Sequence, residues 1–131
     1  MATRLVSVNG MLLAIFRPAL VGAVIGTRLP EVLPAKFVLA RRAGGGSVDP
    51  RFLDRAIVDV QTFAATSKTS EDLSIDARQA LLEVWETQAV FEGGSISHFA
   101  DMSAPSELDD SSIPKNVYRY QASYELGVRP A

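Results

Sequence analysis

The sequence predicts one α+β domain, in which two helices pack on one face of a mainly antiparallel sheet of four to five strands. The 131 residues are enough for one hydrophobic core but not for two. Two segments carry apolar residues in steps of three and four, as helices do, and the others alternate between apolar and polar residues, as strands do. The resulting order, α-β-β-β-α-β-β, does not require the parallel crossovers of an α/β fold.

The first helix is predicted from about Leu5 to Arg17, with Pro18 stopping it there. This apolar run superficially resembles the core of a signal peptide. However, Asn9 and Gly10 interrupt it, and Pro18 ends it before it reaches the ~20 residues of a membrane span. We therefore expect a buried helix.

Three strand signals follow the first helix. Residues 20–27 form a short β-branched run between prolines, residues 35–41 form a second strand, and residues 52–64 alternate over their whole length. The second and third strands are separated by a glycine run that we expect to form a flexible hairpin loop: Gly44, Gly45 and Gly46.

The second helix is predicted with Ser70 as its N-cap and with an inward apolar stripe that starts at Leu73. It runs to about Ala89. A pair of glycines then releases the chain into another predicted strand at residues 95–102.

An exposed loop and a final strand complete the chain. Residues 103–115 hold two prolines and an acidic run, which favour a long loop, and residues 117–128 alternate clearly as a strand. Three tyrosines share one side of that strand: Tyr118, Tyr120 and Tyr124. With few basic residues nearby, they favour a core or a subunit contact over a platform for nucleic-acid bases.

The composition argues against several classes of function. Thirteen basic and fifteen acidic residues give a net charge of -2, too small to hold a polyanion, so no specific nucleic-acid binding is expected. The chain has no cysteine and one histidine, His98, so a zinc site lacks ligands. No glycine run opens a helix as phosphate-binding loops do. We therefore expect no cofactor, no metal and no membrane segment.

No catalytic set is evident in the sequence, and we expect the chain not to be an enzyme. No serine has the G-x-S-x-G surroundings of a nucleophile elbow. Asp54 and Asp59 fall on opposite faces of their strand and cannot share a proton. A small enzyme with a pocket that joins His98 to a carboxylate is the less favoured alternative.

Three stretches, taken in order, resemble the tail terminator proteins of long-tailed phages that infect actinobacteria and similar hosts. They are LPE at residues 29–31 followed by FVLARRAGG at residues 37–45, DRAIVDVQTFA at residues 54–64, and VYRYQASYELGVRP at residues 117–130. The resemblance spans roughly residues 28 to 130 and rests on order and spacing. The third glycine, Gly46, and the apolar N-terminal helix depart from the family pattern.

The resemblance implies a structural virion protein. Such subunits form a ring, usually of six, that caps the head-proximal end of the tail tube, stops its polymerisation and joins it to the neck. The implied partners are further copies of the chain, the tail tube protein and a neck or head-completion protein, and DNA passes through the ring. Assembly takes place in the host cytoplasm. Another neck or head-completion protein is the main alternative.

The resemblance and the predicted loops together suggest which residues contact other subunits or the neck. We expect the glycine loop and residues 103–115 to move or become ordered on assembly, because both are polar or glycine-rich connections. Arg41 and Arg42 either meet acidic groups of a partner or are solvated. The full set of predicted contact residues is Arg41, Arg42, Gly44, Gly45, Gly46, Glu107, Asp109, Asp110, Arg119 and Arg129.

Overall fold

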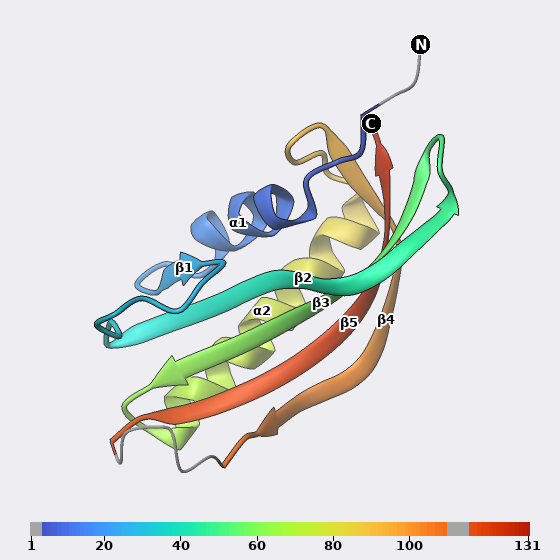
Figure 1. Ribbon diagram of the computed structural model, residues 1–131. Helices are drawn as coiled ribbons and strands as arrows, with labels where there is room; N and C mark the ends of the chain where they lie inside the picture. The colour runs from blue at the N-terminus through green and yellow to red at the C-terminus, as the bar shows by residue number, and fades with distance from the viewer. Residues whose placement is uncertain (1–3, 110–115) are drawn as a thin grey trace.

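The sheet has five strands, and both helices pack on the same face of it (Figure 1). The computed structural model describes residues 4–109 and 116–131. The elements are α1 (Val8–Ala19), β1 (Val24–Gly26), β2 (Lys36–Asp49), β3 (Leu53–Ala64), α2 (Ser67–Thr87), β4 (Gly94–Glu107) and β5 (Tyr118–Pro130). The predicted fold class and the predicted order of elements are confirmed.

The strand order across the sheet is β1-β2-β3-β5-β4. Every neighbouring pair is antiparallel except β1 and β2, which are parallel. β1 has three residues, so the strand predicted at residues 20–27 is much shorter than expected. Leu20 cannot join it, because the Leu20 N–H donates to Phe16 O at 2.8 Å and closes the end of α1.

One hydrophobic core joins the two helices to the sheet. It contains α1 residues such as Phe16, α2 residues such as Leu81, and the inward side chains of β2, β3, β4 and β5. The face of β3 that the alternation assigns to the core is at most 2% exposed at every position: Ala56, Val58, Val60, Thr62 and Ala64. A smaller cluster of Phe37, Leu39 and Phe63 lies apart from this core.

α1 begins at Val8, three residues after the predicted start, and ends two residues beyond the predicted end. The Ser7 side chain caps its start by accepting a hydrogen bond from Gly10 N at 3.1 Å. Its end lies at Ala19, so the prediction that Pro18 stops the helix one residue earlier is wrong. A proline in the last turn removes one backbone donor, and the burial of Ile15 and Phe16 just before it holds this end of the helix in place.

The N-cap of α2 is Thr66 and not Ser70. The Thr66 side chain accepts a hydrogen bond from Thr69 N at 3.1 Å. Ser70 is fully buried and connects the helix to β3, because its hydroxyl donates to Thr62 O at 2.9 Å while the Thr62 hydroxyl donates to Ser70 O at 2.8 Å. The helix ends at Thr87, two residues before the predicted end, where Gln88 adopts a left-handed conformation.

Two predicted loops are partly strand. The glycines at 44–46 belong to β2 and pair with β3, so the hairpin turn lies further on, at residues 50–52. β4 extends to Glu107, so residues 103–107 are not loop either. Leu108 and Asp109 follow the strand outside regular secondary structure, and residues 110–115 of the predicted loop, with Asp110, lie outside the described residues.

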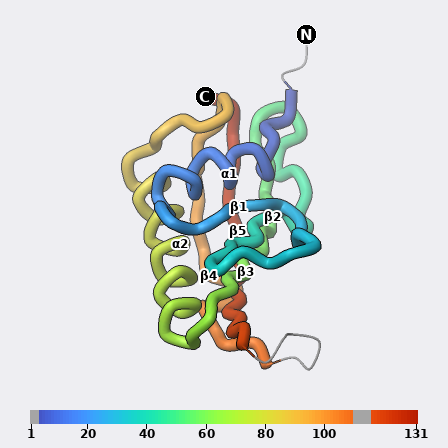
Figure 2. Tube along the Cα trace, turned by 90° about the vertical axis from the view of Figure 1, so that its left-hand side faces the viewer, coloured from blue at the N-terminus to red at the C-terminus, as the bar shows by residue number. Residues whose placement is uncertain are grey.

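Figure 2 shows that α2 and the segment between β1 and β2 lie on opposite sides of the molecule. α2 packs on β3, β4 and β5, whereas α1 packs on β1, β2 and α2. The β1 side and the α2 side of the domain are therefore two separate surfaces.

Candidate functional site

The predicted contact residues that the structure describes do not form one cluster. Glu107 and Asp109 lie beside Arg119 at one end of the sheet, where Leu108 N donates to Arg119 O at 2.8 Å. Arg129 lies at the other end, next to the β2–β3 turn, because its neighbour Val128 pairs with Asp54. Arg41, Arg42 and the glycines occupy β2 between these ends.

Arg42 is a structural residue. Its guanidinium forms a bidentate ion pair with Asp54, at 2.5 Å and 2.9 Å, and its Nε donates to Gly44 O at 2.9 Å. Asp54 is 4% exposed, so this carboxylate depends on Arg42 for its charge partner. The Arg42 backbone N–H donates to Asn9 Oδ1 at 2.8 Å, which fixes α1 to β2. The Arg42 guanidinium is therefore not simply solvated, because it already has a carboxylate partner within the chain.

Arg41 points to the opposite, open face of the sheet and is exposed. It lies opposite Asp59, which lies opposite Ser123 in the next strand. Asp59 accepts hydrogen bonds from the Ser123 hydroxyl at 2.8 Å and from Gln121 Nε2 at 3.5 Å. The Arg41 guanidinium, by contrast, forms no ion pair with the residues that the structure describes, and so it is available to a partner.

Gly45 is required by the backbone of β2. It has a φ of +95°, and a Cβ added there would lie 2.0 Å from Arg55 O. Gly44 and Gly46 have nothing within 4 Å of an added Cβ. The strand is also irregular between Arg42 and Gly44, where its register with β3 shifts. The glycines therefore form a bulged edge of the sheet, and the bulge changes the direction of the strands at the end of the hairpin.

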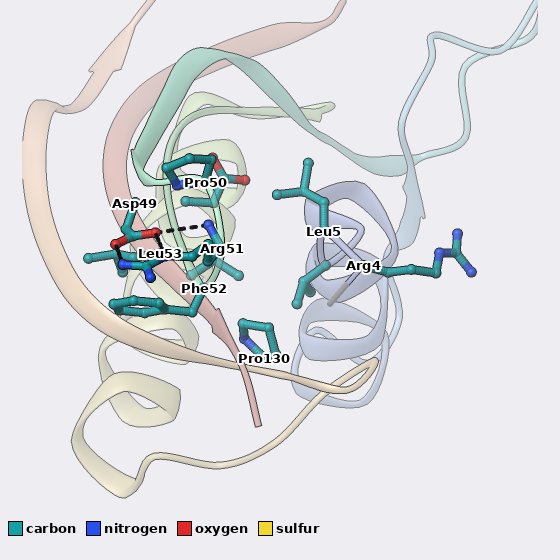
Figure 3. Close-up of a pocket in the computed structure, with 11 residues that line it drawn as sticks. Arg4, Leu5, Asp49, Pro50, Arg51, Phe52, Leu53 and Pro130 are labelled. Atoms are coloured by element: carbon teal, nitrogen blue, oxygen red, sulfur yellow. Dashed lines mark hydrogen bonds and ion pairs between the residues drawn. The ribbon is translucent and has the colours of Figure 1, made fainter. Parts of the chain in front are cut away.

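The β2–β3 turn and the N-terminal segment face each other across a small cavity (Figure 3). Its volume is about 20 Å³, room for about one water molecule. Arg51 pairs with Asp49 at 3.0 Å on the turn and holds the pKa of Asp49 below its ordinary value. Beside this pair, Val48 and Phe52 are 62% and 54% exposed. The cavity is too small for a substrate, but the turn presents apolar surface.

The opposite end of the sheet combines an apolar cluster with charges. Arg119 lies over the Phe63 ring at 5.9 Å, and Phe63 is 6.0 Å from Phe37. Glu107 and Asp109 are both exposed at the end of β4. Arg119 is therefore partly a packing residue, while the two carboxylates are open to a partner.

The His98 side chain lies near a carboxylate, but at a solvent-exposed position. Its Nε2 lies 3.6 Å from Glu125 Oε1, and Glu125 also lies 4.0 Å from Arg55. The His98 side chain is 54% exposed on the bulged strand β4. Within residues 4–109 and 116–131, no hydrogen bond joins His98 to a serine or threonine hydroxyl. A nucleophile activated by His98 is therefore not assembled in this part of the chain.

Two of the three tyrosines on β5 belong to the core. Tyr124 is fully buried, with its ring 5.2 Å from that of Phe99, and Tyr120 is 8% exposed. Burial raises the pKa of Tyr124 strongly, and the charge of Asp101 adds to this effect while Arg78 opposes it. Only Tyr118, at 39%, reaches solvent substantially. The packing interpretation is confirmed for Tyr120 and Tyr124.

Among residues 4–109 and 116–131, no three His, Cys, Asp or Glu side chains gather in a group suited to a metal ion. In the same residues, no helix combines the length and the apolar character needed to span a bilayer.

Comparison with known proteins identifies no relative: no protein-family model matches the chain, and a search of curated proteins returns no significant match.

Some surface features of the structure have no recognisable signal in the sequence. The exposed side chains Val48 and Phe52 could have been recognised only if the turn had been placed at residues 50–52. The pairing of Arg42 with Asp54 carried no local signal, because the two residues are 12 positions apart and become neighbours only through strand register. The exposed residues described above thus lie on several surfaces of the described structure and do not surround one pocket.

Proposed function

We propose that this chain is the tail terminator subunit of a long-tailed phage. Copies of it close into a ring, six being usual in the family it resembles, at the head-proximal end of the tail tube. The ring stops tube polymerisation and joins the tube to the neck, and DNA passes through its centre. The protein assembles in the host cytoplasm and remains in the virion.

One observation carries the proposal. The three stretches that resemble tail terminators fall on β2, β3 and β5, which are neighbours in the sheet. Residues from each stretch lie in one row across the open face: Arg41, Asp59 and Ser123. Segments that are far apart in the sequence thus contribute to one continuous surface, as expected if the resemblance reflects a shared functional face.

The position of the exposed groups is consistent with a subunit whose two ends contact different partners. The β2–β3 turn with Phe52 lies at one end of the strands, and Glu107 and Asp109 lie at the other. A ring whose strands run between its two rims presents one end to the tube and the other to the neck. Ring closure itself requires a heterologous contact, in which two different surfaces of each subunit meet.

The experiment is an assembly assay with purified tail tube protein. We expect tubes to elongate without limit when the chain is absent, and to stop with one end capped when it is added. Unchanged tube length, or binding to head particles and not to tubes, would contradict the proposal; binding to heads alone would indicate a different neck protein.

Two charge reversals at opposite ends of the sheet sharpen the assay. Glu107→Lys and Arg129→Glu both change exposed side chains, so both variants should fold normally. One variant should lose tube capping while it keeps head joining, and the other should show the reverse. If both variants lose the same step, the two ends do not have separate partners.

A further inference from the structure

We infer that neighbouring copies of this chain meet through two surfaces of complementary charge, an acidic stripe on α2 of one copy and a basic connection before β2 of the next. The acidic stripe is Asp72, Ile75, Asp76, Gln79, Glu83 and Glu86. The basic connection is residues 27–36, which are the segment between β1 and β2 together with Lys36, the first residue of β2. The inference rests on the proposed ring and names the contact that closes it.

The acidic stripe follows from the spacing of residues on α2. Its members recur in steps of three and four on the side of the helix away from the core, and all are exposed. α2 carries five acidic and two basic residues, and both bases are already paired: Lys68 with Asp72 at 3.2 Å and Arg78 with Asp101 at 2.7 Å. The remaining stripe carboxylates have no ion-pair partner among the described residues: Asp76, Glu83 and Glu86.

The basic connection has the opposite charge and an apolar surface. Arg28 and Lys36 are exposed and form no ion pair with any residue that the structure describes, and Glu31 is the single acid in the segment. Between them, Leu29 is 55% and Val32 is 83% exposed. Two prolines in the segment restrict its backbone, which lowers the entropy lost on docking.

The acidic stripe also has an apolar counterpart. Ile75 is 50% exposed within the stripe. Along its edge, a groove of about 360 Å³ runs between α1 and α2 beside Glu83, lined by apolar side chains that include Ile15 and Val84. A partner that suits this face brings apolar side chains flanked by positive charge. The basic connection, with Leu29 and Val32, has that composition.

The elements that carry the two surfaces, α2 and the segment between β1 and β2, lie on opposite sides of the molecule (Figure 2). A contact between them is heterologous, so each subunit uses one surface for the copy before it and the other for the copy after it. Repetition of such a contact closes into a ring when the rotation between subunits permits. The charge pattern therefore favours a ring over a two-fold dimer, which would place like charges together.

Two double variants test this contact by native mass measurement at low ionic strength. Asp76→Lys with Glu83→Lys reverses the acidic stripe, and Arg28→Glu with Lys36→Glu reverses the basic connection. Each variant alone should associate at least about 100-fold more weakly than the unmodified chain, because every contact then faces like charges. The matched control, Arg4→Glu with Glu92→Lys, reverses two exposed charges outside both surfaces and should associate normally.

Mixing the two double variants gives the decisive result. The intact basic connection of one variant faces the intact acidic stripe of the other, and the two reversed surfaces also complement each other. The mixture should therefore form rings in which the variants alternate. A mixture that stays monomeric, or an unmodified chain that is monomeric at every concentration, would overturn the inference. Rings that follow this pattern but leave tube length unchanged would support the contact and reject the tail-terminator function.

Discussion

The two faces of the same four long strands differ sharply. The face under the helices is apolar and almost fully buried, with Val58, Val60 and Tyr124 each at 0% exposure. The open face carries polar side chains such as Arg41 and Asp59, and Asp59 accepts hydrogen bonds from Ser123 and Gln121 of the neighbouring strand. An antiparallel sheet commonly has one face on the core and one in solvent.

The two faces therefore have different roles: the helix-covered face stabilises the domain, and the open face is available for contacts with partners. Among the described residues, an apolar cluster lies at one end of the open face, where Phe37, Leu39 and Phe63 pack together. Stability should therefore depend on the helix-covered face, whereas substitutions on most of the open face should change contacts with other proteins and leave the fold intact.

The largest expected effect comes from the aromatic residues of the two faces. Tyr124→Ala should lower the free energy of unfolding by about 4 kcal/mol, because it leaves a cavity under the helices. Phe63→Ala, in the small cluster on the open face, should lower it by about 2 kcal/mol, since fewer neighbours surround the ring. Urea denaturation measures both values. Equal losses would show that the open face is as important for stability as the core.

Tyr124→Phe is the control for this pair. The Tyr124 hydroxyl is buried and has no hydrogen-bond partner among the described residues. Its removal should therefore change stability by less than about 1 kcal/mol. A large loss from Tyr124→Phe would mean that the hydroxyl, and not the ring, carries the effect.

A smaller effect is expected at the bulged edge of β2. Gly45→Ala should cost about 3 kcal/mol, because alanine is strained at a φ of +95° and its Cβ would collide with Arg55 O. Gly46→Ala, with open space around the added Cβ, should change the midpoint of thermal unfolding little. Similar midpoints for the two variants would argue against the described path of the strand.

The smallest effect compares two adjacent arginines on opposite faces. Arg42→Ala should lower the free energy of unfolding by about 2 kcal/mol, since it leaves the buried carboxylate of Asp54 unpaired. Arg41→Ala should change it by less than about 0.5 kcal/mol, because Arg41 is exposed. If Arg41→Ala proved the more destabilising of the two in chemical denaturation, the assignment of their roles would be wrong.

Much of the fold could be predicted because periodicity reports burial directly. The alternation of residues 52–64 identified β3, and the apolar steps from Leu73 onwards identified the body of α2. The predictions failed where distant residues decide. The glycine run predicts a loop, but its residues pair with β3 and are part of a strand. Ser70 has the residue type of a helix cap, but its hydroxyl donates a hydrogen bond to Thr62 O.

The contact residues were harder to predict than the fold. Arg41 and Arg42 are adjacent and chemically identical, and only the burial of Asp54 on one face distinguishes them. The exposed charges of the acidic stripe carry no distinctive signal in the sequence either, because solvated charges on a helix are common. That these charges are opposite in sign to those of the basic connection, and lie on the other side of the molecule, can be recognised only from the folded structure.

The most direct test of the proposed function is a mass measurement of the purified chain alone and bound to tail tubes. We expect a closed ring whose mass is a whole multiple of the subunit mass, six in the family that the chain resembles, with one ring at the head-proximal end of each tube whatever its length. Bound mass that grows with tube length, or no binding to tubes at all, would contradict the assignment as a tail terminator.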